Sequence, residues 1–245
     1  MTVLSKSSLN TYITCPMLFK FTYVDKIKPE CLSPQAQRGI DFHQFACDFY
    51  DNIHISGNIM QIDQKWLQEQ KTVMTEDVLP FVTNFIEMEQ DRWNLCVNKF
   101  PECPEKYYMP VLKEKKILNL GLEIVGIIDR VDLNFDGKTY TICDYKTEKF
   151  DMRSWKVTEH RREAAFYKYL LENSGLIDGE VTDFAFIYPR SNDVWAEKFG
   201  SRTINAFFKK LTDVREKIKR EEFPCKVSIF CRYCDCNGMC PMETY

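Results

Sequence analysis

Apolar residues near the start of the chain recur at helical spacing. From Ser5 to Val24 this period predicts a helix that Ser5 caps, with Pro16 at a kink or a restart. A second helix is predicted from about Pro34 to Ile53, because its apolar residues gather on one face. The residues on that face are Phe42, Phe45, Ala46 and Phe49.

The helical pattern then continues through the middle of the chain. Residues 62–100 keep helical periodicity throughout, with a break at Pro80. Residues 101–110 are bounded by prolines and are predicted to form a loop.

After residue 110 the period changes from helical to alternating. Val, Ile, Tyr and Thr become frequent, which predicts strands at 111–119, 122–133 and 138–147. Asp136 and Gly137 supply a two-residue hairpin turn between the last two of these strands. A helix at 158–173, a strand at 181–188 and a long charged helix at 201–221 complete the pattern.

The register of the predicted hairpin brings two acids together. With the turn centred between Asp136 and Gly137, Asp129 lies directly opposite Asp144. Such cross-strand neighbours have Cβ atoms about 4.5–5.5 Å apart, and like charges there are destabilising unless something compensates them. A divalent cation would do so, and Lys146 projects to the same face as Asp144 because side chains alternate along a strand.

The alternative to a functional site is a solvent-facing hairpin that carries scattered charges. Against it, Asp129 follows the apolar run Ile124 to Ile128, and Asp144 follows Ile142 and Cys143. Both acids therefore stand at the ends of predicted core strands, which favours a functional site.

Composition fits an ordinary globular protein. With 245 residues, 44% of them hydrophobic and 28% charged, the chain is predicted to form one large domain, or one domain with an inserted lobe. The chain has no apolar run long enough for a transmembrane helix, and its N-terminus is polar. We therefore expect a cytoplasmic protein that does not bind a membrane. The net charge of -3 gives no overall basic surface, so any nucleic-acid contact must rest on local patches. Basic patches lie at 113–116, 156–162 and 209–220. Each of them is either a surface that contacts nucleic acid or a solvated face of a helix or strand.

Cysteines cluster at the C-terminal end. The chain has 11 of them, and four lie within CRYCDCNGMC at 231–240. In a reducing compartment an odd number of cysteines argues against a disulfide framework, so the cluster indicates a metal site.

Two motifs resemble a known nuclease family. GIIDRVD at 126–132, followed by DYKT at 144–147, is similar to the active-site hairpin of the PD-(D/E)XK nuclease superfamily, in particular its RecB-like branch. SKSSLNTYITCPMLFKFTY at 5–23 resembles the opening helix of that branch, and RGIDFH at 38–43 resembles the helix whose histidine joins the metal site. EAAFY at 163–167 occupies the place of the Gln-x-x-x-Tyr helix, with Glu163 where glutamine is usual.

The resemblance implies a fold. We expect an α/β protein with a restriction-endonuclease-like core, in which helices flank a mixed central sheet, and a single RecB-like nuclease domain over residues 1–245. Residues 50–110 match nothing in the family and would form a helical insertion, or lobe, over the active site. The aromatic residues of this lobe would stack on bases or, as their helical spacing favours, pack in the core. They are Trp66, Phe81, Phe85 and Trp93.

The resemblance also implies a site. Mg²⁺ or Mn²⁺ would be held by His43, Asp129, Asp144 and the backbone carbonyl of Tyr145, unless His43 is only a satisfied core histidine. Glu114 would assist through a water or a second metal, or is a surface glutamate. The residues implied in catalysis are Asp129, Asp144, Lys146, Glu163 and Tyr167, and phosphate contacts would suit Arg161, Arg162 and Lys168.

Iron-sulfur members of the RecB-like branch imply a role for the cysteines. Cys15 would join Cys231, Cys234 and Cys240 around a [4Fe-4S] cluster that connects the N- and C-terminal segments, with 225–245 as the cluster-binding segment. Tetrahedral zinc is the alternative, since four-cysteine sites with this spacing are common zinc sites. Cys225 and Cys236 fall outside the expected set.

The implied activity is metal-dependent hydrolysis of DNA. We expect an exonuclease that acts on single-stranded DNA or DNA ends, with a partner protein in repair or CRISPR adaptation. The chain has no phosphate-binding GxxxxGK[ST] loop and so would supply no motor. A non-catalytic DNA-binding or scaffold module, and a zinc-stabilised adaptor, are the alternatives.

Overall fold

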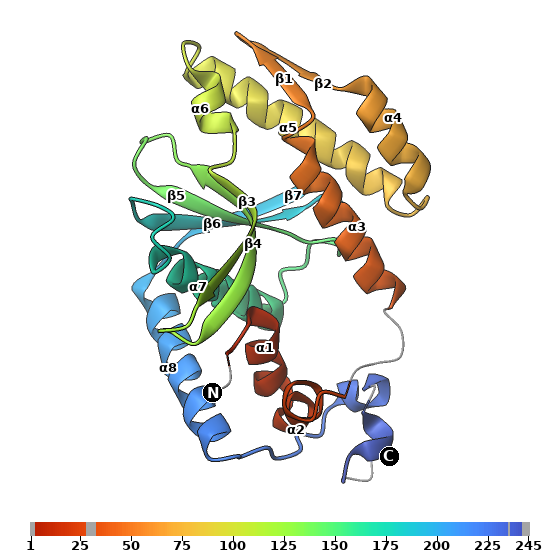
Figure 1. The fold of residues 1–245 in the computed structure, drawn as a ribbon, viewed down its shortest axis with the longest axis vertical. Helices are drawn as coiled ribbons and strands as arrows, with labels where there is room; N and C mark the ends of the chain where they lie inside the picture. Colours follow the sequence, from red (N-terminus) through yellow and green to blue (C-terminus); the bar gives the residue numbers. More distant parts are fainter. Residues whose placement is uncertain (1–2, 28–32, 235, 242–245) are drawn as a thin grey trace.

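A mixed sheet lies at the centre of the molecule in the computed structural model, which describes residues 3–27, 33–234 and 236–241 (Figure 1). Within these residues the strand order is β3-β4-β5-β6-β7, antiparallel throughout except for the parallel pair β5 and β6. The crossover between that pair runs through helix α7, as a parallel pair requires. The strands are β3 (Leu112–Asn119), β4 (Ile124–Leu133), β5 (Tyr140–Tyr145), β6 (Val181–Tyr188) and β7 (Asp193–Lys198).

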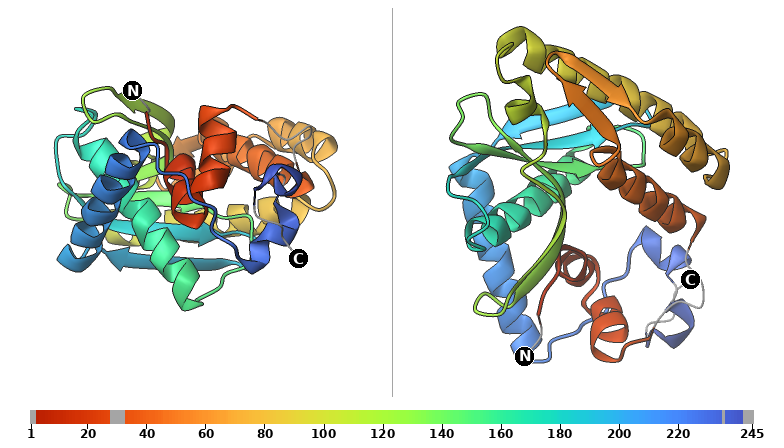
Figure 2. Two further views of the ribbon diagram at one scale, coloured as in Figure 1. Left: turned by 90° about the horizontal axis from the view of Figure 1, so that it is seen from below. Right: turned by 45° about the horizontal axis from the view of Figure 1, so that its top comes forward.

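One face of the sheet is covered by α1 (Lys6–Thr14), α7 (Ser154–Glu172) and α8 (Ser201–Lys219). Seen from below, α7 and α8 run side by side (Figure 2, left). The apolar stripes of these helices meet the sheet and one another through Leu9, Phe166, Leu170 and Phe207, all of them buried.

The opposite face carries α3 (Pro34–Phe49), α4 (Gln64–Val73), α5 (Leu79–Lys99) and α6 (Pro104–Tyr108). The predicted apolar face of α3 is buried, and Phe42 packs edge-on against both Phe85 of α5 and Tyr145 of β5. Phe81, Phe85 and Trp93 are buried in the same cluster, and Trp66 stacks on Phe45 at 5.2 Å. The aromatic residues of this segment therefore pack in the core, as their spacing favours.

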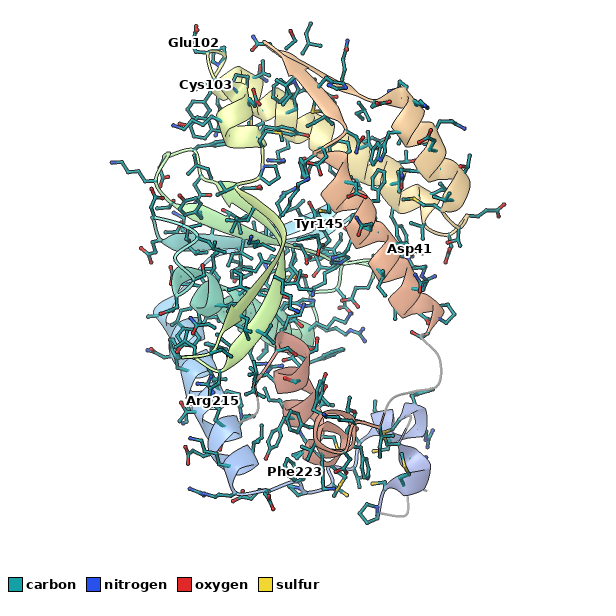
Figure 3. All side chains as sticks on the ribbon, viewed as in Figure 1. Asp41, Glu102, Cys103, Tyr145, Arg215 and Phe223 are labelled. Carbon is teal, nitrogen blue, oxygen red and sulfur yellow. The ribbon has the colours of Figure 1, made fainter. Side chains whose placement is uncertain are left out.

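The N-terminal helix follows the predicted pattern. Ser5 caps α1 in a reciprocal pair of hydrogen bonds with Ser8, and the helix ends at Thr14. Pro16 then starts α2 (Pro16–Phe19), which continues as a π-helical turn, η1 (Lys20–Val24). The chain returns to this region at its other end, where Phe223 stacks on Phe19 at 6.1 Å (Figure 3) and two short 3-10 turns follow, η2 (Ile229–Tyr233) and η3 (Asn237–Met239).

Four elements differ from the sequence prediction. A hairpin of β1 (Ile53–Ser56) and β2 (Ile59–Ile62) lies in the segment expected to be helical, and α6 lies in the expected loop. Gly57 has a φ of +57, which allows the tight turn of that hairpin. The edge strand β7 was not predicted, because its exposed side carries charged residues that hide the apolar alternation.

The central hairpin has the predicted register but a longer turn. Arg130 pairs with Cys143, and Leu133 pairs with Tyr140. This register, extended by one pair beyond the ladder, sets Asp129 opposite Asp144. The loop spans residues 135–138, since the backbone N-H of Asn134 donates to the carbonyl of Thr139 at 2.8 Å. A longer loop with the same centre leaves the register unchanged, so the wrong turn length had no effect on the pairing of the acids.

Among the described residues, no helix has the length and apolar character needed to cross a membrane.

Candidate active site

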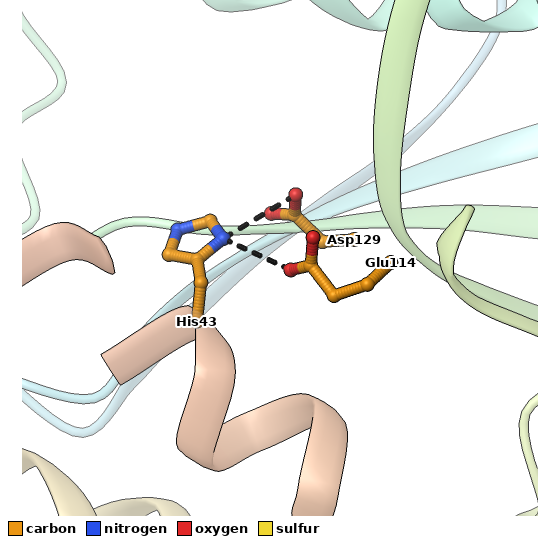
Figure 4. Close-up of side chains that lie close together, drawn as sticks. All are labelled: His43, Glu114 and Asp129. Atoms are coloured by element: carbon orange, nitrogen blue, oxygen red, sulfur yellow. Dashed lines mark ion pairs between the residues drawn. The ribbon is translucent and has the colours of Figure 1, made fainter. Parts of the chain in front are cut away.

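Three side chains with metal-binding groups meet where α3 faces β3 and β4 (Figure 4). One ligand atom each of His43, Glu114 and Asp129 lies within 4.8 Å of the others. Nδ1 of His43 lies 3.4 Å from Oε1 of Glu114 and 3.4 Å from Oδ1 of Asp129. Carboxylate oxygens with one imidazole suit Mg²⁺ or Mn²⁺, so the residues present fit a divalent cation.

The charge balance of this group favours a cation. Burial would lower the pKa of His43, but hydrogen bonds to Asp129 and Glu114 outweigh it and raise that pKa to about 10. The side chain of Asp129 is only 7% exposed. Two carboxylates therefore share one imidazolium at the wall of a pocket of about 790 Å³, where the side chains of His43 and Glu114 are half-buried.

Glu114 stands at an irregularity in β3. Its φ is +41, a conformation that is uncommon for residues other than glycine. The pairing of β3 with β4 passes from Lys113 and Arg130 to Lys115 and Ile128 without a partner for Glu114. Backbone strain of this kind costs on the order of 1–3 kcal/mol and clusters at functional sites.

The backbone of Tyr145 connects the acid and the histidine. Its N-H donates to Oδ2 of Asp129 at 2.8 Å, and its carbonyl oxygen lies 3.2 Å from Nε2 of His43. Its side chain points to the opposite face of β5, where the Tyr145 hydroxyl accepts from Nη1 of Arg130 at 3.1 Å. Packing of the ring between the sheet and α3 (Figure 3) thus fixes the backbone groups that face the site.

Asp144 is surrounded by two lysines. Its Oδ2 lies 2.7 Å from Nζ of Lys146, and its Oδ1 lies 3.2 Å from Nζ of Lys6. Lys146 also lies 2.9 Å from Oε2 of Glu163 on α7. Lys146 and Asp144 therefore lie on one side of β5, as the alternation of the strand predicts.

These contacts shift the titration of all the groups involved. Burial would raise the pKa of Asp144, but Lys146 and Lys6 outweigh it and lower that pKa. Burial would likewise lower the pKa of Lys146, whereas Asp144 and Glu163 raise it. Both carboxylates are ionised and both ammonium groups are charged at neutral pH, which makes the cluster a preorganised set of charges.

The four expected metal ligands do not form one group. His43 and Asp129 lie together, and the carbonyl of Tyr145 faces His43. Asp144 lies outside the group of ligand atoms within 4.8 Å, and Glu114, expected only in an assisting role, lies inside it. The carboxylate of Asp144 is turned towards the lysines instead.

The family model described as PD-(D/E)XK nuclease superfamily matches residues 3–241. The chain belongs to the PD-(D/E)XK nuclease superfamily. A search of curated proteins found no match.

One solved structure has a fold similar to that of this chain. The chain is similar to a proposed exonuclease from Eubacterium rectale, with 11% identity and a TM-score of 0.54, over 98% of this chain and 89% of that one. It also matches a structure called SSO0001 at 16% identity and a TM-score of 0.33, over 74% of this chain and 95% of that one. At this identity the first likeness concerns the fold alone.

Close packing of α7 on β4 explains the glycine that opens the GIIDRVD motif of this nuclease-superfamily chain. A Cβ on Gly126 would lie 2.9 Å from Leu170 and 3.2 Å from the ring of Tyr167. Tyr167 is only 5% exposed, and Nζ of Lys6 lies 5.2 Å from the centre of its ring. Tyr167 thus packs mainly as a core residue and reaches the pocket at its edge.

Sequence patterns missed three polar residues that contact Asp144 or Glu163. Lys6 contacts Asp144, Nδ2 of Asn10 donates to Oε1 of Glu163 at 2.9 Å, and Nδ1 of His160 lies 3.3 Å from Oε2 of the same carboxylate. Lys6 and Asn10 belong to α1, which docks beside β4 through a bridge between Leu4 and Ile124. Their place inside the family's opening-helix motif was the only available signal.

The three cations of α7 that were expected to contact phosphate each bond to other groups of the protein. Arg161 forms two hydrogen bonds with Glu197, at 2.9 Å and 2.7 Å. Lys168 is held by Glu172 at 2.7 Å and by the carbonyl of Val181 at 2.6 Å. Arg162 donates to Oδ1 of Asn10 at 3.0 Å. Lys168 is therefore committed to the fold.

Cysteines from both ends of the chain line one pocket of about 60 Å³ next to α2. Sγ of Cys225 lies 3.6 Å from Sγ of Cys240, and Sγ of Cys231 accepts from the backbone N-H of Ser228 at 3.3 Å. Within the described part of the chain, no three thiols have their sulfurs mutually within 4.8 Å. The cysteines on this pocket are Cys15, Cys225, Cys231, Cys234, Cys236 and Cys240.

Proposed function

We propose that this chain is a divalent-metal-dependent deoxyribonuclease of the RecB-like branch, an exonuclease that hydrolyses single-stranded DNA or DNA ends. The observation that carries the proposal is the meeting of His43, Glu114 and Asp129 within 4.8 Å, beside the ion pair of Asp144 and Lys146. Membership of a nuclease superfamily supports the same chemistry.

The proposed cation would be held by His43, Asp129, Asp144 and the carbonyl of Tyr145, with Glu114 as a further oxygen ligand. When bound, it lowers the pKa of a coordinated water and stabilises the charge that develops on the phosphate. An imidazole among the ligands suits Mn²⁺ better than Mg²⁺.

The proposed roles of the lysines follow from their charge and position. Lys146 keeps its proton, because Asp144 and Glu163 raise its pKa, and so acts as a hydrogen-bond donor to the water or to the phosphate. Glu163 orients the ammonium group of Lys146 from α7 at 2.9 Å. Lys6 opens onto the same pocket and would contact a phosphate oxygen of the substrate.

Preference for single strands rests on residues 50–110. We propose that this segment is a lobe of a single nuclease domain that spans residues 1–245, and that it restricts access to the site to one strand. Tyr167 at the pocket edge would then contact that strand.

A [4Fe-4S] cluster held by Cys15, Cys231, Cys234 and Cys240 is the second part of the proposal. Tetrahedral zinc, with bonds to sulfur of about 2.3 Å, is the alternative occupant of the same thiolates. A [4Fe-4S] cluster would connect Cys15 to the segment 225–245. Reduced thiolates fit a cytoplasmic protein, and a protein of DNA repair or CRISPR adaptation is the proposed partner.

The test is degradation of end-labelled single-stranded and duplex DNA by anaerobically purified protein with Mg²⁺ or Mn²⁺. The wild type is expected to shorten the single strand, and Asp144→Ala to abolish shortening. Asp91→Ala, which removes an exposed acid on α5, is the matched control and should cleave normally. If wild type and Asp144→Ala are equally inert, this chain does not cleave DNA by itself and is either a binding module or one half of an enzyme whose partner is missing.

A further inference from the structure

A second pocket, of about 260 Å³, lies between the N-terminal halves of α7 and α8. It lies apart from the acidic group, and no acidic residue lines it. Four of its lining residues are cationic, namely Arg161 and Arg162 from α7 and Arg202 and Lys210 from α8. The two helices that form the pocket lie side by side in Figure 2, left.

The cations of this pocket are only partly neutralised. Glu197 satisfies Arg161, and Asp213 lies 3.9 Å from Nζ of Lys210, at the limit of an ion pair. Arg162 is held by the neutral amide of Asn10. Within the described residues, Arg202 forms no ion pair and is exposed, so positive charge is left over in a chain whose net charge is -3.

A short chain of hydrogen bonds joins this pocket to the catalytic lysine. Arg162 donates to Asn10 at 3.0 Å, and Asn10 donates to Glu163 at 2.9 Å. Glu163 in turn accepts from Lys146 at 2.9 Å. The two sites therefore share one rigid stretch of α7, with a fixed spacing between them.

We propose that the pocket between α7 and α8 binds a backbone phosphate of the nucleic-acid strand, away from the phosphate that is cut. Guanidinium groups bind phosphate oxygens through paired donors, and such contacts fix the register of a strand without reading its sequence. The proposal rests on the proposed function, since it extends the path of the same substrate. It assigns strand binding to Arg202 and Lys210 of α8, which lie outside the family motifs.

Binding of a labelled polythymidine strand in EDTA tests this inference without cleavage. For a single strand, loss of one phosphate contact reduces the magnitude of the slope of log affinity against log salt concentration by about 0.7. At 0.1 M salt this corresponds to a loss of about 5-fold in affinity. Arg202→Gln should show this loss. The double variant Arg202→Gln with Lys210→Gln should bind about 25-fold more weakly, and the magnitude of its salt slope should be smaller by about 1.4. Arg220→Gln, at the exposed C-terminal end of α8, is the matched control and should bind as the wild type does.

The outcomes separate this inference from the proposed function. Wild-type affinity and salt slope in the double variant would overturn the phosphate pocket, even if the protein cleaves DNA. Loss of affinity in that variant would support it, even if no condition yields cleavage. Because Arg202 and Lys210 are exposed, both variants should fold, and an unchanged Tm checks this.

Discussion

The ammonium group of Lys146 lies 2.9 Å from a carboxylate oxygen of Glu163 on α7. Glu163 is 7% exposed and also accepts from Asn10. Burial would raise the pKa of Glu163, but Lys146 and His160 lower it, so the carboxylate is ionised. Lys146 thus helps to balance the negative charge of Glu163.

Glu163→Gln tests the role of that charge. An amide oxygen still accepts from Lys146, but the charge-assisted part of the hydrogen bond is lost, so the free energy of unfolding should fall by roughly 1–2 kcal/mol. Cleavage of single-stranded DNA should persist within about tenfold, whereas Glu163→Ala should lose more because Lys146 is no longer oriented. Urea unfolding and initial cleavage rates measure both, and equal rates for the two variants would contradict the positioning role.

His43→Ala should raise the Mn²⁺ concentration that gives half-maximal cleavage by at least about tenfold, because a side chain that supports the cation is removed. The measurement is a metal titration of the cleavage rate. His54→Ala removes an exposed histidine of β1 and should leave the titration curve unchanged. An identical curve for His43→Ala would exclude His43 from the metal site.

Glu89 predicts an acid-sensitive contribution to stability. Burial would raise the pKa of Glu89, but Arg92 and Arg130 outweigh it and lower the pKa from 4.5 to about 2. A lowered pKa contributes stability above the unfolded value of 4.5, and this stability is lost as pH falls from 4.5 towards 2. The contribution is on the order of 3 kcal/mol.

The comparison of wild type with Glu89→Gln in urea at several pH values measures this effect. The difference in the free energy of unfolding should be large at pH 7 and should shrink below pH 4.5. Glu87→Gln changes an exposed acid on the same helix and should be neutral throughout. A difference that does not depend on pH would mean that the ion pair with Arg130 contributes no net stability.

Gly126→Ala tests the close approach of α7 to β4. The added methyl group would lie 2.9 Å from Leu170 and 3.2 Å from Tyr167, so the helix or these side chains must shift. We expect a loss of about 1–3 kcal/mol in unfolding free energy and reduced cleavage, because Glu163 lies on the same helix. In Gly121→Ala the new methyl group meets only Asn119, at 3.5 Å, and stability should be nearly unchanged.

Cysteine variants test the proposed cluster. Anaerobic protein should be brown and contain about four iron atoms per chain, and Cys240→Ser should lose both colour and iron. Cys225→Ser should retain them, although its sulfur lies 3.6 Å from that of Cys240, because the expected set does not include it. Cys103→Ser, at an exposed cysteine, is the control. Colourless protein with one bound zinc would replace the iron-sulfur proposal.

The sequence by itself determined the elements whose causes are local. The apolar period predicted α1, α3, α7 and α8, and the hairpin turn set the register that places Asp129 opposite Asp144, since pairing across a hairpin depends only on the residues around its turn. The alternation of β5 likewise placed Lys146 beside Asp144.

Only the tertiary structure decided which distant residues join them. Lys6 is 138 positions from Asp144 and reaches it because α1 docks beside β4, a matter of packing that no local pattern encodes. Glu114 meets His43 because α3 lies over β3 and β4, and Arg202 lines the same pocket as Arg162 because α8 lies along α7. Such contacts depend on how apolar faces from the whole chain are buried together, so they become visible only once the helices are placed on the sheet.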